Sequence, residues 1–184
     1  MNRVVSIVGM AGSGKSEAAR IFEGMNFAKV RFGDITDEEI KRRGLDLIEK
    51  NERAVREDLR KEHGMAAYAK LSLPRIQALL QNSDVILDGL YSWDEFLLLR
   101  EHFGSSFAVI AVWTSPATRY ERLAKRAVRP LTSEEAASRD KAEIENLRKG
   151  GPIAMADFTI CNEGTLQELE SATQDILIRL GCSR

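Results

Sequence analysis

The sequence predicts a three-layer α/β/α fold built around a five-stranded parallel sheet. Short apolar runs alternate along the chain with longer stretches of helical character, and the first run leads through a glycine-rich turn directly into a helix. Strands that alternate with helices form βαβ units, in which neighbouring strands run parallel. The 184 residues suffice for one domain with a substantial core.

Composition narrows the class of protein. The chain is 43% hydrophobic and 30% charged, which is typical of a soluble globular enzyme and argues against disorder. Its net charge of -1 gives no general attraction to nucleic acid or anionic membranes, and no apolar run is long enough to span a bilayer. Cys161 and Cys182 lack metal-ligand spacing and are expected to be reduced thiols. We therefore expect a cytoplasmic protein, monomeric or homodimeric, with no membrane or nucleic-acid partner.

Apolar segments place the five strands. The expected strands cover residues 3–8, 27–32, 84–88, 107–113 and 158–161. The fourth of these is apolar throughout, as a strand buried on both faces should be.

Helix starts are marked by the pattern Ser/Thr-x-x-Glu, in which the two side chains cap free backbone N–H groups. The pattern occurs at Thr36, Ser92, Thr132 and Thr165. Ser115, which precedes a proline, predicts a fifth helix start.

Residues 9–16, Gly-Met-Ala-Gly-Ser-Gly-Lys-Ser, follow the first expected strand and precede a helix, which is the context of a phosphate-binding P-loop. Glycines allow successive backbone N–H groups to surround a polyphosphate, and the helix N-terminus adds partial positive charge. Lys15 would reach the terminal phosphates, and the Ser16 hydroxyl would bind Mg²⁺. The residues expected to bind a nucleoside polyphosphate are Gly9, Met10, Ala11, Gly12, Ser13, Gly14, Lys15, Ser16 and Glu17.

Two segments exceed what simple crossovers need. Residues 36–81 hold several helices between the second and third strands, and residues 126–151 form a highly charged stretch with few apolar positions. In a P-loop protein, the first would be a helical insertion that covers the acceptor, and the second a LID that closes over the donor phosphates.

Cations are the chemical groups that a kinase needs most, because phosphoryl transfer depends on positioning and charge neutralisation. Arg122 and Arg126 lie four residues apart and are expected on one helical face, where they could bind phosphate oxygens. Arg129 and Arg139 follow in the charged segment. The alternative for these arginines is a solvated basic face paired with neighbouring glutamates.

Two aspartates are expected at the carboxyl edge of the sheet. Asp88 ends the third strand and could bind Mg²⁺ through water, or could simply form a turn with Gly89. Asp34 follows the second strand, where it could take a proton from a hydroxyl acceptor, bind substrate, or act only as an acid near a helix start. Arg56 and Arg60, four apart in the first insertion, could hold an anionic acceptor.

These features together resemble the nucleoside monophosphate kinase branch of P-loop proteins. The order of residues 122–126, 131–136 and 162–166 is similar to that in dephospho-CoA kinases, whereas residues 87–89 resemble adenylate kinase-related proteins. The resemblance implies a P-loop NTPase fold, ATP as phosphoryl donor, Mg²⁺, and a CORE, acceptor-site and LID arrangement. It also implies that Asn162 and Gly164 lie near the adenine.

The sequence therefore predicts an ATP-dependent small-molecule kinase. The acceptor would be a nucleotide or nucleotide-like metabolite, either a nucleoside monophosphate or a hydroxyl as in dephospho-CoA. Residues expected in catalysis are Lys15, Asp34, Arg122 and Arg126, and those expected to bind the acceptor are Asp34, Arg56, Arg60, Arg129 and Arg139. The alternative is a P-loop NTP-binding switch or slow NTPase that has no small-molecule acceptor.

Overall fold

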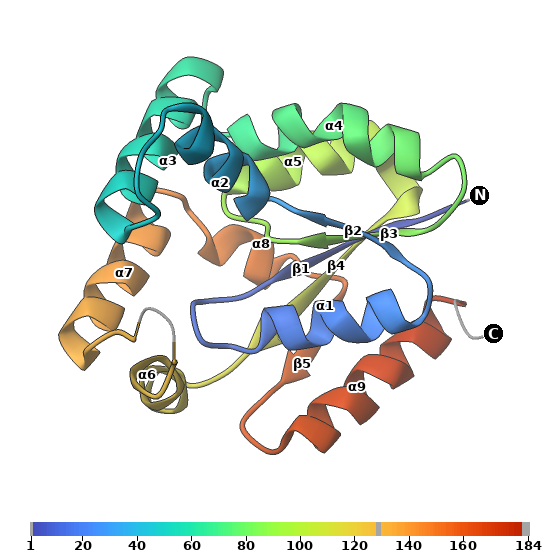
Figure 1. The fold of residues 1–184 in the computed structure, drawn as a ribbon. Coiled ribbons are helices and arrows are strands. Elements are labelled where there is room, and N and C mark those ends of the chain that lie inside the picture. The colour runs from blue at the N-terminus through green and yellow to red at the C-terminus, as the bar shows by residue number, and fades with distance from the viewer. Residues whose placement is uncertain (1, 128–129, 182–184) are drawn as a thin grey trace.

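A computed structural model describes residues 2–127 and 130–181 and contains a five-stranded sheet between two layers of helices (Figure 1). The strands are β1 (Val4–Val8), β2 (Ala28–Arg31), β3 (Val85–Asp88), β4 (Phe107–Trp113) and β5 (Phe158–Cys161). Their order is β2-β3-β1-β4-β5, and every neighbouring pair is parallel. The predicted three-layer fold with a parallel sheet is confirmed.

The register brings the ends of three strands together beside the glycine-rich turn. Ile7 of β1 pairs with Asp88 at the end of β3, and Val8 pairs with Ala111 of β4. β1 is the central strand, with β3 and β2 on one side of it and β4 and β5 on the other. The strand order therefore reverses beside β1, and the carboxyl end of β1 is the switch point at which open α/β sheets bind ligands.

Successive side chains of each strand pack on opposite faces of the sheet, so the core has two parts. In β1, Val4 and Val8 pack into one buried cluster, while Val5 and Ile7 pack into the cluster on the opposite face. Side chains of a strand alternate between the two faces, so a sheet covered on both sides needs apolar residues at every position. This requirement explains the continuous apolar runs in the sequence.

Two helices cover each face of the sheet. On one face lie α1 (Lys15–Gly24) and α9 (Leu166–Arg179), and on the other α4 (Ala67–Leu79) and α5 (Trp93–Phe103) (Figure 1). A single 3-10 turn (Gly104–Ser106) links α5 to β4.

The segment between β2 and β3 forms α2 (Gly33–Arg42), α3 (Glu49–His63) and α4, and α2 and α3 project beyond the carboxyl edge of the sheet (Figure 1). The cap predicted at Thr36 is wrong, because α2 already begins at Gly33. Thr36 is instead buried, with its hydroxyl 2.7 Å from the Tyr68 hydroxyl.

The charged segment forms α7 (Ser133–Glu145) and leads into the short α8 (Gly150–Ala154), while α6 (Pro116–Ala124) precedes it. The side chains of Ser92, Ser115, Thr132 and Thr165 each accept a hydrogen bond from the backbone N–H three residues later, so these four predicted caps are confirmed. In the described part of the chain, no helix combines the length and apolar character that crossing a bilayer requires.

Candidate functional site

The glycine-rich turn, which we call the P-loop (residues 9–16), joins the end of β1 to the start of α1. Gly12 and Gly14 have φ angles of 81° and 95°, which side-chain-bearing residues rarely adopt. A Cβ atom on Gly12 would lie 2.8 Å from the Arg119 carbonyl oxygen, and one on Gly14 would lie 2.4 Å from Asn162 Nδ2. The loop conformation and its close packing against two other elements therefore both require glycine.

Lys15 lies at the first turn of α1, and its Nζ donates a hydrogen bond to the Met10 carbonyl oxygen at 2.8 Å. Burial, followed in importance by the charge of Lys149, lowers the pKa of Lys15 to about 7. An anion nearby stabilises the charged form of a lysine, so this position favours binding of a negatively charged group.

The groups that could hold Mg²⁺ are oxygen donors at the sheet edge. Asp88 is 7% exposed at the end of β3, and Lys29 Nζ lies 3.7 Å from its carboxylate. Ser16 stands exposed in the first turn of α1, and the buried Ser13 hydroxyl has no hydrogen-bond partner among the described residues. The described residues also include no group of three or more His, Cys, Asp or Glu that could hold a metal by themselves. This donor set fits Mg²⁺, which is commonly held by one or two protein oxygens together with substrate phosphates.

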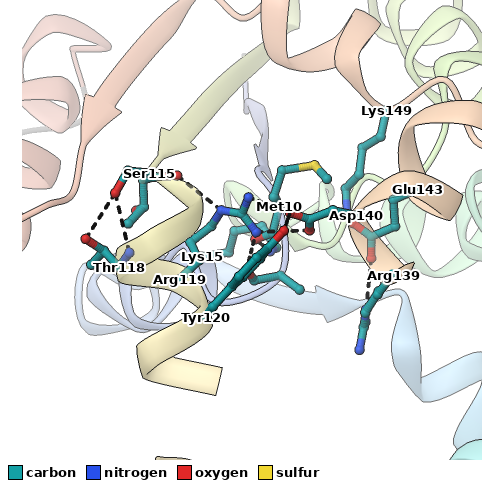
Figure 2. Close-up of polar contacts among 12 residues, drawn as sticks. Met10, Lys15, Ser115, Thr118, Arg119, Tyr120, Arg139, Asp140, Glu143 and Lys149 are labelled. Carbon is teal, nitrogen blue, oxygen red and sulfur yellow. Dashed lines mark hydrogen bonds and ion pairs between the residues drawn. The ribbon is translucent and has the colours of Figure 1, made fainter. Parts of the chain in front are cut away.

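Arg119 of α6 anchors the P-loop to the lid segment (residues 126–151). Its guanidinium is buried and donates to both carboxylate oxygens of Asp140 in α7, at 3.0 and 2.6 Å, and to the Ala11 carbonyl oxygen at 3.1 Å (Figure 2). The Tyr120 hydroxyl donates to the same carboxylate at 3.0 Å. Arg119 of α6 therefore connects the P-loop, near the start of the chain, with α7.

The role of Arg119 was missed in the sequence, although a signal was present. Leu123 is fully buried, and Arg119 lies one turn before it on the same face of α6. Apolar residues such as Leu123 indicate the buried face of a helix, and a charged residue one turn away on that face, here Arg119, is ordinarily expected to be exposed.

The expected helical pairing of Arg122 with Arg126 is wrong, because α6 ends at Ala124 and Arg126 lies beyond it. Arg122 instead donates to the carbonyl oxygens of Asn162 at 3.0 Å and Gly164 at 3.3 Å. The structure therefore brings together three residues expected to bind the nucleotide, but Arg122 contacts the loop after β5 and not Arg126.

Arg126 and Arg139 lie close to each other. Partial burial lowers the pKa of Arg126, and the charge of Arg139 lowers it further. Arg139 Nε also donates to Glu143 Oε1 at 3.1 Å. Two neighbouring cations create a local positive potential that suits an anion. Arg129, also expected at this site, lies outside the described residues.

Glu143 and Lys149 form a buried ion pair that sequence reasoning missed. Lys149 Nζ donates to Glu143 Oε2 at 2.8 Å, and Arg139 approaches the other carboxylate oxygen from the opposite side (Figure 2). Burial alone would raise the pKa of Glu143, but Lys149 and Arg139 more than offset it and lower this pKa to about 2. In a segment this rich in charge, sequence alone gives no sign of which charged residues become buried.

Asn162 packs the loop after β5 against the P-loop. Its side-chain amide donates to the Ser13 carbonyl oxygen at 2.8 Å, and the Thr114 hydroxyl lies within hydrogen-bonding distance of the Ser13 and Asn162 carbonyl oxygens, at 3.2 and 3.0 Å. Both side chains are buried. Asn162, expected near the adenine, thus lies beside the P-loop.

Asp34 lies in the first turn of α2 and is already paired with cations. Its carboxylate accepts a hydrogen bond from Arg31 at 2.9 Å and lies 4.0 Å from Arg75. The same Arg31 nitrogen also donates to Asp37 at 2.8 Å. The Asp34 carboxylate is therefore already engaged by two arginines.

Arg56 and Arg60 lie on α3, as expected from their spacing, but in different surroundings. Arg56 is 3.5 Å from the buried carboxylate of Glu52. The Arg60 guanidinium lies 5.3 Å from the ring centroid of Tyr68, and its buried Nε lacks a hydrogen-bond partner among the described residues. The structure therefore does not join the two arginines into one visible anion clamp.

Comparison with known proteins places the chain in a family. The chain matches the family described as AAA domain over residues 5–146. It is 39% identical to a UPF0200 protein from Thermococcus kodakarensis, over 95% of this chain and 96% of that protein. It is 38% identical to a UPF0200 protein from Thermococcus gammatolerans, over 96% of this chain and 95% of that protein.

Solved kinase structures have the same fold. A gluconokinase from Sinorhizobium meliloti superposes with a TM-score of 0.61 at 18% identity, covering 97% of this chain and 93% of that one. A shikimate kinase from Bacteroides thetaiotaomicron does so with a TM-score of 0.61 at 14% identity, covering 97% and 98%. The fold is therefore that of P-loop kinases.

Proposed function

The chain belongs to the AAA domain family and to the UPF0200 family, and on that premise we propose that it is an ATP-dependent small-molecule kinase. The observation that carries this proposal is the P-loop itself, in which Gly12 and Gly14 adopt positive φ angles and lead directly into α1, with Lys15 in its first turn. Lys149 and Glu143 from the lid segment, and Asp88 from β3, are all close enough to influence the pKa of this lysine. A P-loop with cations above it can bind a triphosphate and stabilise the charge of phosphoryl transfer.

Each part of the chain has a distinct task in this proposal. The P-loop amides and Lys15 bind the phosphates, and Ser16 and Asp88 hold Mg²⁺, which neutralises phosphate charge when bound. Asn162 and Gly164, with Arg122 behind them, border the adenine. The lid segment excludes water that would otherwise hydrolyse ATP.

The acceptor would lie between the P-loop and the insertion of residues 36–81. We propose a nucleotide or nucleotide-like acceptor, of the nucleoside monophosphate or dephospho-CoA type, that Arg56, Arg60, Arg129 and Arg139 contact separately and not as one preformed clamp. Asp34 would orient the acceptor through its pairing with Arg31, and would serve as a base only for a hydroxyl acceptor. Because the proposed reaction transfers a phosphoryl group from ATP to a small metabolite, we place the protein in the cytoplasm, where both substrates occur.

A phosphoryl-acceptor screen tests this function. The protein is incubated with ATP labelled at the γ-phosphate, Mg²⁺ and a panel of nucleoside monophosphates, nucleosides and dephospho-CoA, and the label is followed. We expect transfer to one acceptor class, and we expect Lys15→Met to reduce the rate by about a hundredfold to a thousandfold while the circular dichroism spectrum stays unchanged. The same slow release of phosphate with every acceptor and with none would instead favour an NTP-binding switch or slow NTPase.

A further inference from the structure

Lys149 is a buried cation to which the proposed function assigns no contact with the nucleotide. Its side chain is only 3% exposed, and its Nζ lies 2.8 Å from Glu143 Oε2. Arg139 binds the other oxygen of the same carboxylate at 3.1 Å. Taking both members of an ion pair out of water has a desolvation cost that their attraction often fails to recover, so such a pair is weak evidence of a stabilising role.

Lys149 lies near the P-loop and near the loop that follows β3. After burial, its charge is the strongest influence that lowers the pKa of Lys15 in the P-loop. Its Nζ also lies 5.6 Å from the ring centroid of Tyr91, in the loop that follows Asp88.

Asp140, which lies on α7 together with Glu143, provides a contrast through its pairing with Arg119 of α6. Both carboxylate oxygens of Asp140 accept from the rigid guanidinium of Arg119, and Tyr120 adds a third donor. That carboxylate is fully engaged in holding α7 on the P-loop. Lys149 instead makes one hydrogen bond to Glu143, and an ammonium has three N–H donors, so it can hold the carboxylate and a phosphate oxygen together.

We propose that Lys149 binds the terminal phosphate of the nucleoside triphosphate, and that Glu143 orients its ammonium toward that place. This inference rests on the proposed function, because it requires a triphosphate at the P-loop. Lys149 would contact the γ-phosphate and not the β-phosphate, since it approaches from the lid and acceptor side. The protein would therefore distinguish a nucleoside triphosphate from the diphosphate through this residue.

Affinity for ATP relative to ADP tests the inference without knowledge of the acceptor. A non-hydrolysable β,γ-imido analogue of ATP and ADP are each titrated with Mg²⁺ into the wild type and into Lys149→Met. We expect the variant to lose about tenfold or more in affinity for the triphosphate, the loss typical of one charged hydrogen bond, and to bind ADP within about twofold of the wild type.

Glu143→Gln is the second variant and should act in the opposite direction. Glutamine retains an oxygen that can accept from Lys149, but it removes a negative charge that repels the phosphate. We expect severalfold tighter binding of the triphosphate analogue and unchanged binding of ADP. Lys141→Met provides the matched control, because Lys141 is an exposed cation on the same helix, 3.9 Å from Glu145, and its loss should change neither affinity.

A purely structural ion pair would give a different pattern. If both variants weaken triphosphate and diphosphate equally, the pair only supports the lid segment and the inference is wrong. Should Lys149→Met fail to fold, Glu143→Gln decides alone: a change in triphosphate affinity with unchanged ADP affinity supports the inference, and equal changes or no change overturn it. A wild type that binds neither nucleotide contradicts the proposed function itself, whereas normal binding with an unchanged ratio in the variants contradicts only the role of Lys149.

Discussion

The lid segment with α6 and the acceptor-side helices α2 and α3 are both rich in charge, yet they place that charge differently. In the former, Arg119 pairs with Asp140, and Lys149 with Glu143, and all four are at most 9% exposed. In the latter, ion pairs such as Arg42–Glu39 and Arg53–Glu57 lie at the surface, with both arginine side chains 73% exposed.

This difference teaches which charges shape the site. Exposed ion pairs contribute little to the free energy of unfolding, because water screens the attraction between their charges. Buried pairs carry a large desolvation cost and tolerate the loss of one partner poorly. Within the lid segment and α6, the buried pair of Arg119 and Asp140 contacts the P-loop directly, so burial rather than abundance distinguishes the charged residues that border this loop.

The largest effect is expected from breaking a buried pair on one side only. Arg119→Leu should destabilise the protein by about 3 to 5 kcal/mol, because it leaves Asp140 as an uncompensated buried charge and removes a donor from the Ala11 carbonyl. Chemical denaturation measures this change. Arg42→Leu is the matched control at an exposed pair and should leave the denaturation midpoint unchanged. Equal effects of the two substitutions would contradict the contrast between the regions.

Two buried glutamates sharpen the comparison through pH. Glu143, beside Lys149 and Arg139, has a pKa of about 2, whereas burial raises the pKa of Glu95 in α5 to about 7. Both would have a pKa near 4.5 in the unfolded chain. Folded Glu95 therefore holds a proton between pH 4.5 and 7 that the unfolded chain releases, so its contribution to stability falls as pH rises through that window. Glu143 behaves oppositely, and its contribution is lost only as pH falls from 4.5 toward 2.

Unfolding free energies measured from pH 3 to pH 8 test these opposite signs. Glu95→Gln should remove a decrease on the order of 3 kcal/mol between pH 4.5 and 7, because glutamine cannot titrate and can still accept from the N-cap backbone. Glu143→Gln should leave that window unchanged and flatten the acid side. Identical profiles for the wild type and Glu95→Gln would show that burial does not raise the pKa of Glu95.

The smallest effects should come from helix caps that differ in burial. Ser92 is fully buried, caps α5 and donates to the Met65 carbonyl oxygen at 2.7 Å, so Ser92→Ala should cost about 2 kcal/mol. Thr165 caps α9 at the surface, and Thr165→Ala should cost about 1 kcal/mol. Thermal unfolding compares the two, and a larger loss at Thr165 would contradict the importance of burial.

Much of the fold could be predicted from the sequence because its signals are local. Continuous apolar runs identified the five strands, and four of the five predicted caps are correct. The cap predicted at Thr36 is wrong because the Thr36 hydroxyl lies within hydrogen-bonding distance of the buried Tyr68 hydroxyl, and α2 begins at Gly33 with no side-chain cap. A local pattern cannot reveal such a competing partner.

The site was predicted less completely, for a physical reason. The P-loop is a contiguous motif, and Asp88 ends a recognisable strand, so both could be located from the sequence. Arg119 and Lys149 lie in charged stretches, and only the docking of α7 on the P-loop determines that they become buried while Lys125 and Lys141 stay exposed. That docking depends on contacts between segments far apart in the chain, which spacing does not encode.

The most direct test of the central claim is a calorimetric titration of the protein with ATP and Mg²⁺, repeated with Lys15→Met. We predict one bound ATP per chain in the wild type and at least about a tenfold loss of affinity in the variant, because Lys15 contributes a charged hydrogen bond to the phosphates. Absence of binding in the wild type, or equal affinity in the two proteins, would contradict a triphosphate site at residues 9–16.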